Sequence, residues 1–328
     1  FTLSPGFTVH AYNSSNEQNS VSGISSSLFS DSFYKILPDF NARIQLKKSE
    51  SLTFNYAMRT QFTDVSKIAE GLVLNSYNSI FSGYNEIQNA ISHNLNLNYF
   101  SFNLFNYTNV YARLSYNKSI DQIRNLTTFE SVVATSSPFN SAFADENFSA
   151  NGRFQRQFGK LRASLKGGFN YSKFNQFIQT STTPSLSESY SQNYGATIRT
   201  SFKQAPNVEL GYNYSFSENI LGSINSTSNT KAPFIDIDAL ILKSFTFRTK
   251  YTNNTFNDDR GGLNKYEFWN ASLSYKKDQD SKWEFELKAT NLLDTKSQNQ
   301  SNTGNISISS TEYFIQPRFI TFRLVYDL

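Results

Sequence analysis

The chain has 328 residues and a net charge of +4; 38% of its residues are hydrophobic, 16% are aromatic and none is cysteine. The lack of cysteine excludes a disulfide framework, a thiol nucleophile and a cysteine metal site. The mean hydropathy is −0.48, and no run approaches the roughly 18 consecutive apolar residues of a membrane helix. Lysine and arginine are scattered singly, so we expect no nucleic-acid partner.

From the N-terminus onward, segments of alternating apolar and polar residues predict an antiparallel meander of about 14 strands. The predicted strands are 2–12, 35–47, 51–62, 89–100, 106–120, 143–158, 161–176, 189–203, 207–217, 233–242, 245–255, 265–276, 282–293 and 312–328. Tight turns between them alternate with longer connections rich in Ser, Asn, Thr and Asp. Short periplasmic turns and long outer loops are typical of outer-membrane barrels.

The fold class that we predict is therefore all-β, an antiparallel transmembrane β-barrel that occupies residues 1–328 as a single domain. The even strand number and the loop pattern place the C-terminal residue, Leu328, at the periplasmic rim of a bacterial outer membrane. The chain shows no starting Met and no signal segment. We therefore expect it to be the processed or truncated form of a longer precursor.

The last strands show the alternation most clearly. Within residues 246–252, Phe247 and Tyr251 lie on one face, and Arg248 and Lys250 lie on the other. Successive side chains of a strand point to opposite faces of its sheet. A soluble sandwich would bury the apolar face against a second sheet, whereas a transmembrane barrel turns it toward lipid and keeps a polar interior.

The turn around Lys243 predicts a specific register. Pairing Ile241 with Phe245 brings opposite charges together across the two strands. The charged pairs are then Asp238 with Arg248 and Asp236 with Lys250. A slip by one residue would move these charges into hydrocarbon, at a cost of roughly 2–4 kcal/mol for each Lys or Arg near the midplane.

The same alternation points a set of basic side chains inward, beside a polar row of Asn94, Asn96 and Asn98. The inward set is Arg43, Arg59, Arg113, Arg153, Arg162, Lys166, Arg199, Arg248, Lys250 and Arg323. The simpler interpretation is a solvated lumen wall; the functional one is a basic interior that grips a plug domain or passes anionic solutes. The candidate lumen contacts are Arg43, Arg59, Arg113, Arg199, Arg248 and Lys250, with Asp236 and Asp238.

Aromatic residues predict two girdles at the membrane interfaces, where rings with one polar end are favoured. Trp283 and Tyr326 are assigned to the periplasmic rim, and Phe268 and Trp269 to the outer one.

Features of an enzyme or a metal site are sparse. The two histidines are His10, near a loop mouth, and His93, on the outward face of its strand. Neither is placed beside a nucleophile, and no histidine pair has ligand spacing. The acidic loop at 257–259 could bind Ca²⁺ through oxygen atoms, but such a stretch is more often a solvated turn. We predict no enzyme activity, no metal site and no cofactor.

Three segments carry a resemblance to known families. The sequence Asn291-Leu292-Leu293-Asp294 closes one predicted strand, and Gln316-Pro317-Arg318 precedes the terminal strand. This order resembles the close of TonB-dependent receptor barrels. Residues 75–99, with Ser92, Asn94, Leu97 and Tyr99, are similar to a stretch of the Bacteroidota outer-membrane β-barrel family.

The resemblance implies a transporter that imports a scarce nutrient such as a siderophore, a glycan or a peptide. It implies a barrel of about 22 strands, so this chain would be the C-terminal part, with the plug domain and the signal peptide absent from it. The implied partners are the lipid bilayer, TonB through the missing plug, a surface lipoprotein, and the barrel-assembly machinery. The alternation that this machinery would read lies at Phe322, Leu324, Tyr326 and Leu328.

Two alternatives stay open. The first is a barrel subunit of a larger outer-membrane complex that does not transport. The second is a self-contained 14-strand passive channel, in which the first and last strands pair. That channel would place Phe7 and Val9 beside Phe322 and Leu324.

Overall fold

A computed structural model describes most of the chain. The described residues are 1–19, 26–61, 64–68, 71–84, 87, 89–178, 184–203, 206–259, 263–278, 280–303 and 308–326. They form β-strands and one four-residue helix, α1 (Val65–Ile68). No helix within these ranges is long and apolar enough to span a membrane.

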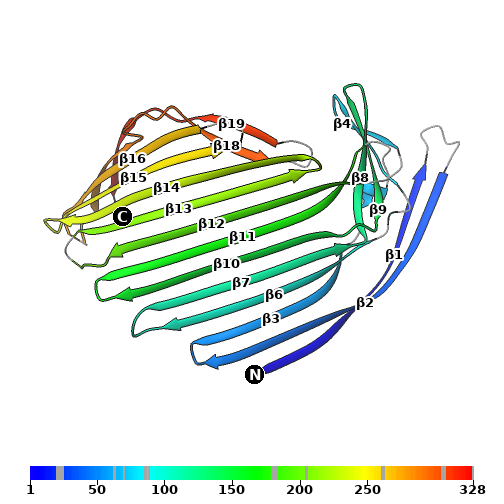
Figure 1. Ribbon diagram of the computed structural model, residues 1–328, viewed down its shortest axis with the longest axis horizontal. Coiled ribbons are helices and arrows are strands. Elements are labelled where there is room, and N and C mark those ends of the chain that lie inside the picture. Colours follow the sequence, from blue (N-terminus) through cyan, green and yellow to red (C-terminus); the bar gives the residue numbers. More distant parts are fainter. Residues whose placement is uncertain are drawn as a thin grey trace.

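Fourteen strands follow one another as antiparallel neighbours in a single curved sheet (Figure 1). They are β1 (Thr2–Asn19), β2 (Ser26–Lys47), β3 (Glu50–Gln61), β6 (Ala90–Asn103), β7 (Thr108–Ile120), β10 (Asp145–Phe158), β11 (Leu161–Ile178), β12 (Ser185–Thr200), β13 (Asn207–Leu221), β14 (Ile224–Ile241), β15 (Phe245–Asp258), β16 (Leu263–Lys276), β17 (Trp283–Thr290) and β20 (Phe319–Tyr326). The predicted all-β antiparallel meander is confirmed, and each predicted segment overlaps one of these strands.

Several segments that the sequence predicts as loops are instead paired strands. They form β4 (Leu72–Ser76), β5 (Ser79–Ser82), β8 (Gln122–Glu130), β9 (Val133–Ser141), β18 (Ser297–Thr303) and β19 (Ile308–Phe314). The predicted loop at 218–232 continues β13 and β14, which stay paired as far as Leu221 and Ile224. These extensions lack a regular alternation of apolar and polar residues, since the adjacent Ile220 and Leu221 fall on opposite faces, and the sequence pattern therefore indicates no strand there.

At one end of the sheet every connection between consecutive strands of the meander has six residues or fewer, and at the opposite end the turn between β13 and β14 is also short, with two residues. A two-residue turn at Gly159 and Lys160 joins β10 to β11, and Gly159 has a φ of +60°, which glycine adopts without steric cost. Both ends of the meander lie on this side as well: Thr2 is paired with Arg43, near the turn between β2 and β3, and Tyr326 is paired with Trp283. The longer hairpins occupy the opposite end (Figure 1).

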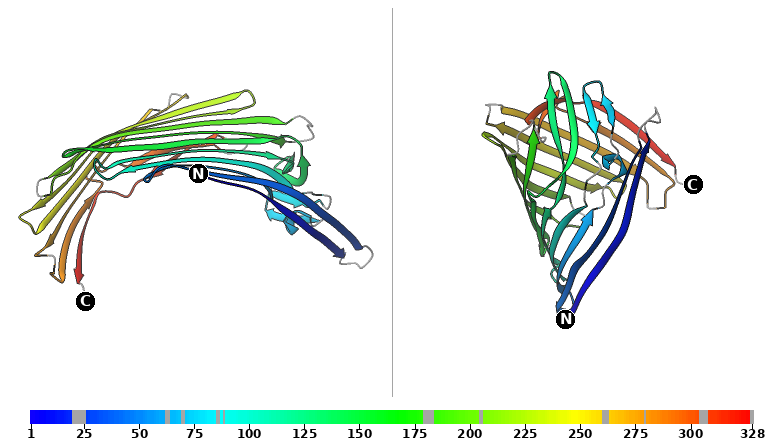
Figure 2. Two further views of the ribbon diagram at one scale, coloured as in Figure 1. Left: turned by 90° about the horizontal axis from the view of Figure 1, so that it is seen from below. Right: turned by 90° about the vertical axis from the view of Figure 1, so that its right-hand side faces the viewer.

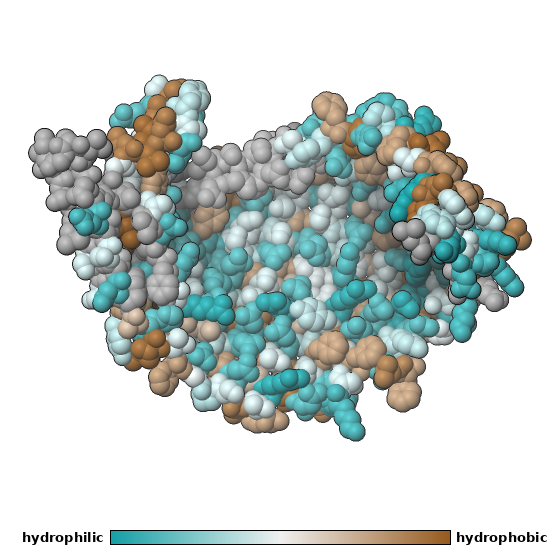
Figure 3. Space-filling model, turned by 180° about the vertical axis from the view of Figure 1, so that it is seen from behind, coloured by the Kyte–Doolittle hydropathy of each residue, from teal (hydrophilic) through white to brown (hydrophobic). Residues whose placement is uncertain are grey.

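The sheet bends into an open trough (Figure 2). Its hollow side is predominantly hydrophilic (Figure 3). The convex side carries apolar side chains that remain exposed, such as Leu165 (56%), Ile198 (58%) and Leu210 (56%) on three consecutive strands. Among the described residues the sheet is one layer thick over these strands, so no second layer covers them (Figure 2).

The two edges of the trough do not meet. In the described ranges β1 is paired with β2 and β20 with β17, and no pairing joins β1 to β20. Phe7 lies opposite Pro38, and Phe322 lies opposite Leu287. The contact between first and last strands that a self-contained channel requires is therefore not formed in this structure, because the sheet curls through only part of a closed circle.

Candidate functional site

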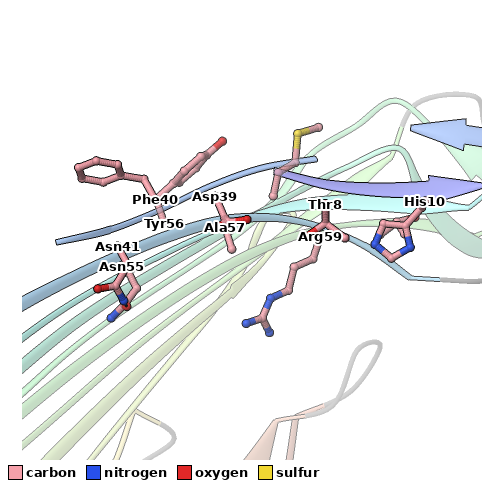
Figure 4. A pocket seen from close by; sticks show the side chains of 11 residues that line it. Thr8, His10, Asp39, Phe40, Asn41, Asn55, Tyr56, Ala57 and Arg59 are labelled. Carbon is pink, nitrogen blue, oxygen red and sulfur yellow. The ribbon is translucent and has the colours of Figure 1, made fainter. Parts of the chain in front are cut away.

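The concave wall collects the polar side chains, and its first three strands show how. A recess of about 520 Å³ lies over β1, β2 and β3. Asn41, Asn55 and Arg59 point to one side of the sheet, and Phe40 and Tyr56 point to the other (Figure 4). The strict alternation of the sequence therefore separates a polar inner surface from an apolar outer one. His10 also lines this recess.

The hairpin of β14 and β15 has the register that the sequence predicts. Ile241 is paired with Phe245, Asp238 with Arg248, and Asp236 with Lys250. These charged pairs therefore lie directly opposite each other on the concave face.

The closest ionic partner of Asp238 differs from the prediction. Its carboxylate contacts Arg199 of β12, two strands away, and Arg199 also lies 3.3 Å from a carboxylate oxygen of Glu209 on β13. The long arginine side chain leans across the intervening strand and reaches both carboxylates. Sequence pairing identifies neighbours on adjacent strands only, and so it misses this three-residue network.

The other predicted lumen contacts lie on the same wall but are dispersed along it. Arg113 donates a hydrogen bond to Asn96 at 3.1 Å, and Asn117 donates one to Asn94 at 2.7 Å, so the predicted asparagine row is part of a polar network. The ammonium of Lys250 lies 5.1 Å from the centre of the Phe234 ring. Further inward positions are Arg43, opposite Thr53 on β3, and Arg323, 3.8 Å from Glu286.

The predicted insertion residues lie on the opposite, apolar surface. Phe322 is paired with Leu287, Leu324 with Phe285, and Tyr326 with Trp283. Leu328 lies outside the described residues.

The aromatic girdles are only partly as predicted. At the end with the short turns, the Trp283 and Tyr326 rings lie 4.6 Å apart, with the ammonium of Lys282 5.8 Å from the Tyr326 ring. Trp269 lies midway along β16, where it is paired with Tyr251 on the convex face, whereas its neighbour Phe268 faces inward because adjacent strand residues alternate. The assignment of Phe268 to the outer girdle is therefore wrong.

Hydrogen-bonded tyrosines mark the outer face toward the end with the long hairpins. The Tyr56 hydroxyl lies 2.8 Å from Nδ1 of His93, and Tyr171 donates to Glu188 at 2.7 Å. Tyr116 donates to Glu146 at 3.1 Å. Rings with an apolar body and a hydrogen-bonded polar end suit a boundary between apolar and aqueous surroundings. The outward position predicted for His93 is confirmed.

A shielded ion pair attaches the hairpin of β8 and β9 to the main sheet. Arg124 lies 2.7 Å from the Asp145 carboxylate, and its side chain is only 8% exposed. It also donates to the backbone carbonyls of Asn175 and Phe143, at 2.7 and 2.8 Å. No sequence pattern indicates this pair, because Arg124 lies in a segment that the sequence predicts as a loop.

Replacing this arginine is expected to release the hairpin. Arg124→Ala leaves the Asp145 carboxylate without its cation and should lower the free energy of opening the hairpin by about 3 kcal/mol. Lys118→Ala is the matched control, because Lys118 pairs with Glu146 at 3.4 Å but is 40% exposed, and should cost less than about 1 kcal/mol. Hydrogen exchange across residues 122–141 measures both, and equal protection in the two variants would contradict this role.

The connection after β17 contains an acidic group whose titration is shifted. The ammonium of Lys296 and a hydrogen bond from the backbone N–H of Arg318 hold the pKa of Asp294 below its ordinary value of 3.8. A lowered folded-state pKa means that the ionised carboxylate favours the folded connection. This contribution is fully present above the unfolded pKa and is lost as the pH falls through the folded one.

Acidification should therefore loosen the link between Asp294 and Arg318. We expect the protection factor of the Arg318 amide to fall between pH 5 and pH 2, and Asp294→Asn to be insensitive to pH over that range. A wild-type amide with unchanged protection at pH 2, after correction for its intrinsic exchange rate, would show that the carboxylate does not hold this connection.

Neither a metal site nor a cofactor site emerges on this wall. The described ranges contain no group of three His, Cys, Asp or Glu side chains placed to hold a metal ion. In the acidic loop, the Asp259 carboxylate accepts a hydrogen bond from the backbone N–H of Thr227 at 2.8 Å.

Comparisons with known proteins give little support beyond the fold. No family model matches the chain, and no curated protein matches it significantly. Among solved structures, the chain is similar to OmpT, an outer-membrane protein of Vibrio cholerae in its trimer form. The sequence identity is 10% and the TM-score 0.37, over 98% of this chain and 97% of that chain. A likeness this distant carries no argument about function.

The expected membership in the TonB-dependent receptor or Bacteroidota barrel families is contradicted, because no family model matches any part of the chain. The residues that carried the resemblance have a local structural role instead. Asn291 and Asp294 have φ values of +52° and +56°, and the Asn291 side chain donates hydrogen bonds to the carbonyls of Thr295 and Gln316. The similar residues therefore form a hydrogen-bonded turn at the end of β17.

Proposed function

We propose that the sheet forms the wall of an outer-membrane β-barrel and lines a water-filled passage for small polar solutes. The observation that carries this proposal is the separation of the two faces, with an uncovered apolar convex side and a polar hollow side (Figure 3). A barrel wall in a membrane has this arrangement, with lipid outside and water inside. The grouping of short turns at one end and long hairpins at the other adds support.

The height of the apolar face suits a bilayer. On β13 the outward positions run from Val208 through Leu210, Tyr212 and Tyr214 to Phe216. The eight steps from Val208 to Phe216 rise about 27 Å, and a tilt of about 40° reduces this to roughly 21 Å across the membrane. This is close to the apolar band of about 25 Å that outer-membrane barrels present to lipid.

The free edges of β1 and β20 need partners in lipid, because each unpaired backbone group there costs several kcal/mol. The edges would be satisfied by pairing with each other or with further strands. Since the chain contains no cysteine, the Phe7→Cys, Leu324→Cys double variant separates the two cases. Oxidative cross-linking in membranes would indicate direct closure, whereas its failure would indicate intervening strands.

Conductance tests the passage itself. Protein purified from outer membranes and inserted into planar bilayers should produce stepwise currents in salt solution. If the protein is recovered in the outer-membrane fraction but produces no current, the result would favour the alternative function, a barrel subunit that does not transport. Recovery in the soluble fraction would contradict the barrel altogether.

A further inference from the structure

A second recess lies on the concave wall, across β10, β11, β12 and β13. It has a volume of about 330 Å³ and lies near the short turn between β10 and β11. Its lining includes the short hydroxyl side chains of Ser164 and Thr197, which occupy directly opposed positions on β11 and β12. Three longer basic side chains, Arg153, Arg162 and Arg199, line it as well. We call this site the arginine recess.

The three arginines differ in their partners. Arg199 is engaged by two carboxylates, those of Glu209 and Asp238. Arg153 donates a hydrogen bond to the neutral amide of Gln155 at 2.9 Å. The Nε atom of Arg162 is buried and has no hydrogen-bond partner among the residues that the structure describes.

Arg153 lies directly opposite a further basic residue, Lys166 of β11. Arg162 lies directly opposite Arg199, whose charge is balanced by Asp238 and by Glu209, a carboxylate that also lines the recess. The stem of Lys166 crosses β12 at Gly195, where a Cβ atom would stand 2.3 Å from its Cε. Like charges placed directly across a strand pair are destabilising, and a buried donor without a partner adds to that cost. An anion bound between these groups would offset both.

We propose that the arginine recess binds an oxyanion, carried by the phosphate or carboxylate group of a solute. The planar guanidinium groups of Arg153 and Arg162 match the two oxygen atoms of such a group. The hydroxyls of Ser164 and Thr197 donate further hydrogen bonds from the wall. The inference rests on the proposed function in one respect, since the solute reaches the recess from the water-filled side of the sheet.

Equilibrium binding to the folded protein in detergent tests the recess without requiring any current. Inorganic phosphate and citrate are titrated separately by calorimetry, so that a preference for phosphate or for carboxylate is visible. The Arg153→Gln, Arg162→Gln double variant should weaken binding of the preferred anion by about tenfold or more, since hydrogen bonds to charged groups are strong. Arg323→Gln is the control, because Arg323 lies on the same concave face, outside the recess, and is 69% exposed.

The outcomes separate this inference from the proposed function. Binding that the double variant loses and the control keeps supports the recess, even if the bilayers carry no current. Wild-type protein that binds neither anion, or variants that bind equally well, would overturn it, even if current flows. Should the double variant fail to fold, Arg153→Gln alone, at an exposed position, should still weaken binding several-fold, and unchanged binding would again overturn the proposal.

Discussion

Leu210→Arg is expected to destabilise the protein in a bilayer. The free energy of unfolding should fall by about 2–4 kcal/mol, the cost of an arginine near the midplane of the lipid-facing surface. Leu210 lies in the interior of β13, between Ile198 of β12 and Ile235 of β14, and is 56% exposed on the convex face. No second layer of the sheet covers it. An arginine there has only lipid, or a distorted bilayer, for its surroundings.

The matched control is Ser215→Arg, on the same strand but on the concave face, where its neighbours are Asn193 and Thr230. The new arginine would enter a polar, wet wall, so its effect should stay within about 0.5 kcal/mol. Urea titration of protein reconstituted in liposomes measures both variants. Equal costs for the two arginines would contradict the assignment of the convex face to lipid.

Asn291→Ala is expected to lower the free energy of unfolding by about 4 kcal/mol. The Asn291 side chain donates to the carbonyls of Thr295 and Gln316, at 2.9 and 3.0 Å, and accepts from the backbone N–H of Thr295 at 2.9 Å. Each such bond contributes about 1 kcal/mol net. Its φ of +52° adds a further cost, because alanine adopts this region less readily than asparagine.

Asn291→Gly separates the two causes. Glycine loses the same three hydrogen bonds but accepts the positive φ, so its cost should be about 1 kcal/mol smaller than that of alanine. The urea midpoints of the two variants, compared in the same liposomes, give this difference. Wild-type stability in both variants would mean that the Asn291 network does not hold the end of β17.

The sequence predicts the meander well where one face of a strand is apolar. The hairpin of β14 and β15 is the clearest case, because a slip by one residue would exchange Ile235 and Asp236 between lipid and water, and its register is as predicted. In the continuation of β13 to Leu221 the apolar residues Ile220 and Leu221 fall on opposite faces, so no single face is apolar and the pattern does not predict a strand. The sequence therefore predicts such strand segments as loops.

The site is less predictable than the fold. Strand alternation assigns Arg199 and Asp238 to the inner face, but their contact crosses an intervening strand and depends on how a long side chain leans. The shielded pair of Arg124 and Asp145 joins a loop hairpin to the sheet, a contact that no local pattern encodes. A short motif such as that around Asn291 reports a turn conformation, and the turn alone does not identify a family.

Water accessibility along β13 tests the two-faced wall most directly. Since the chain has no cysteine, single cysteines at each position from 208 to 216 can be labelled with a membrane-impermeant maleimide in liposomes, without background. We predict labelling at 209, 211, 213 and 215 and protection at 208, 210, 212, 214 and 216, because successive side chains face water and lipid in turn. Uniform labelling of all nine positions, or protection without alternation, would contradict a membrane wall with a wet inner face.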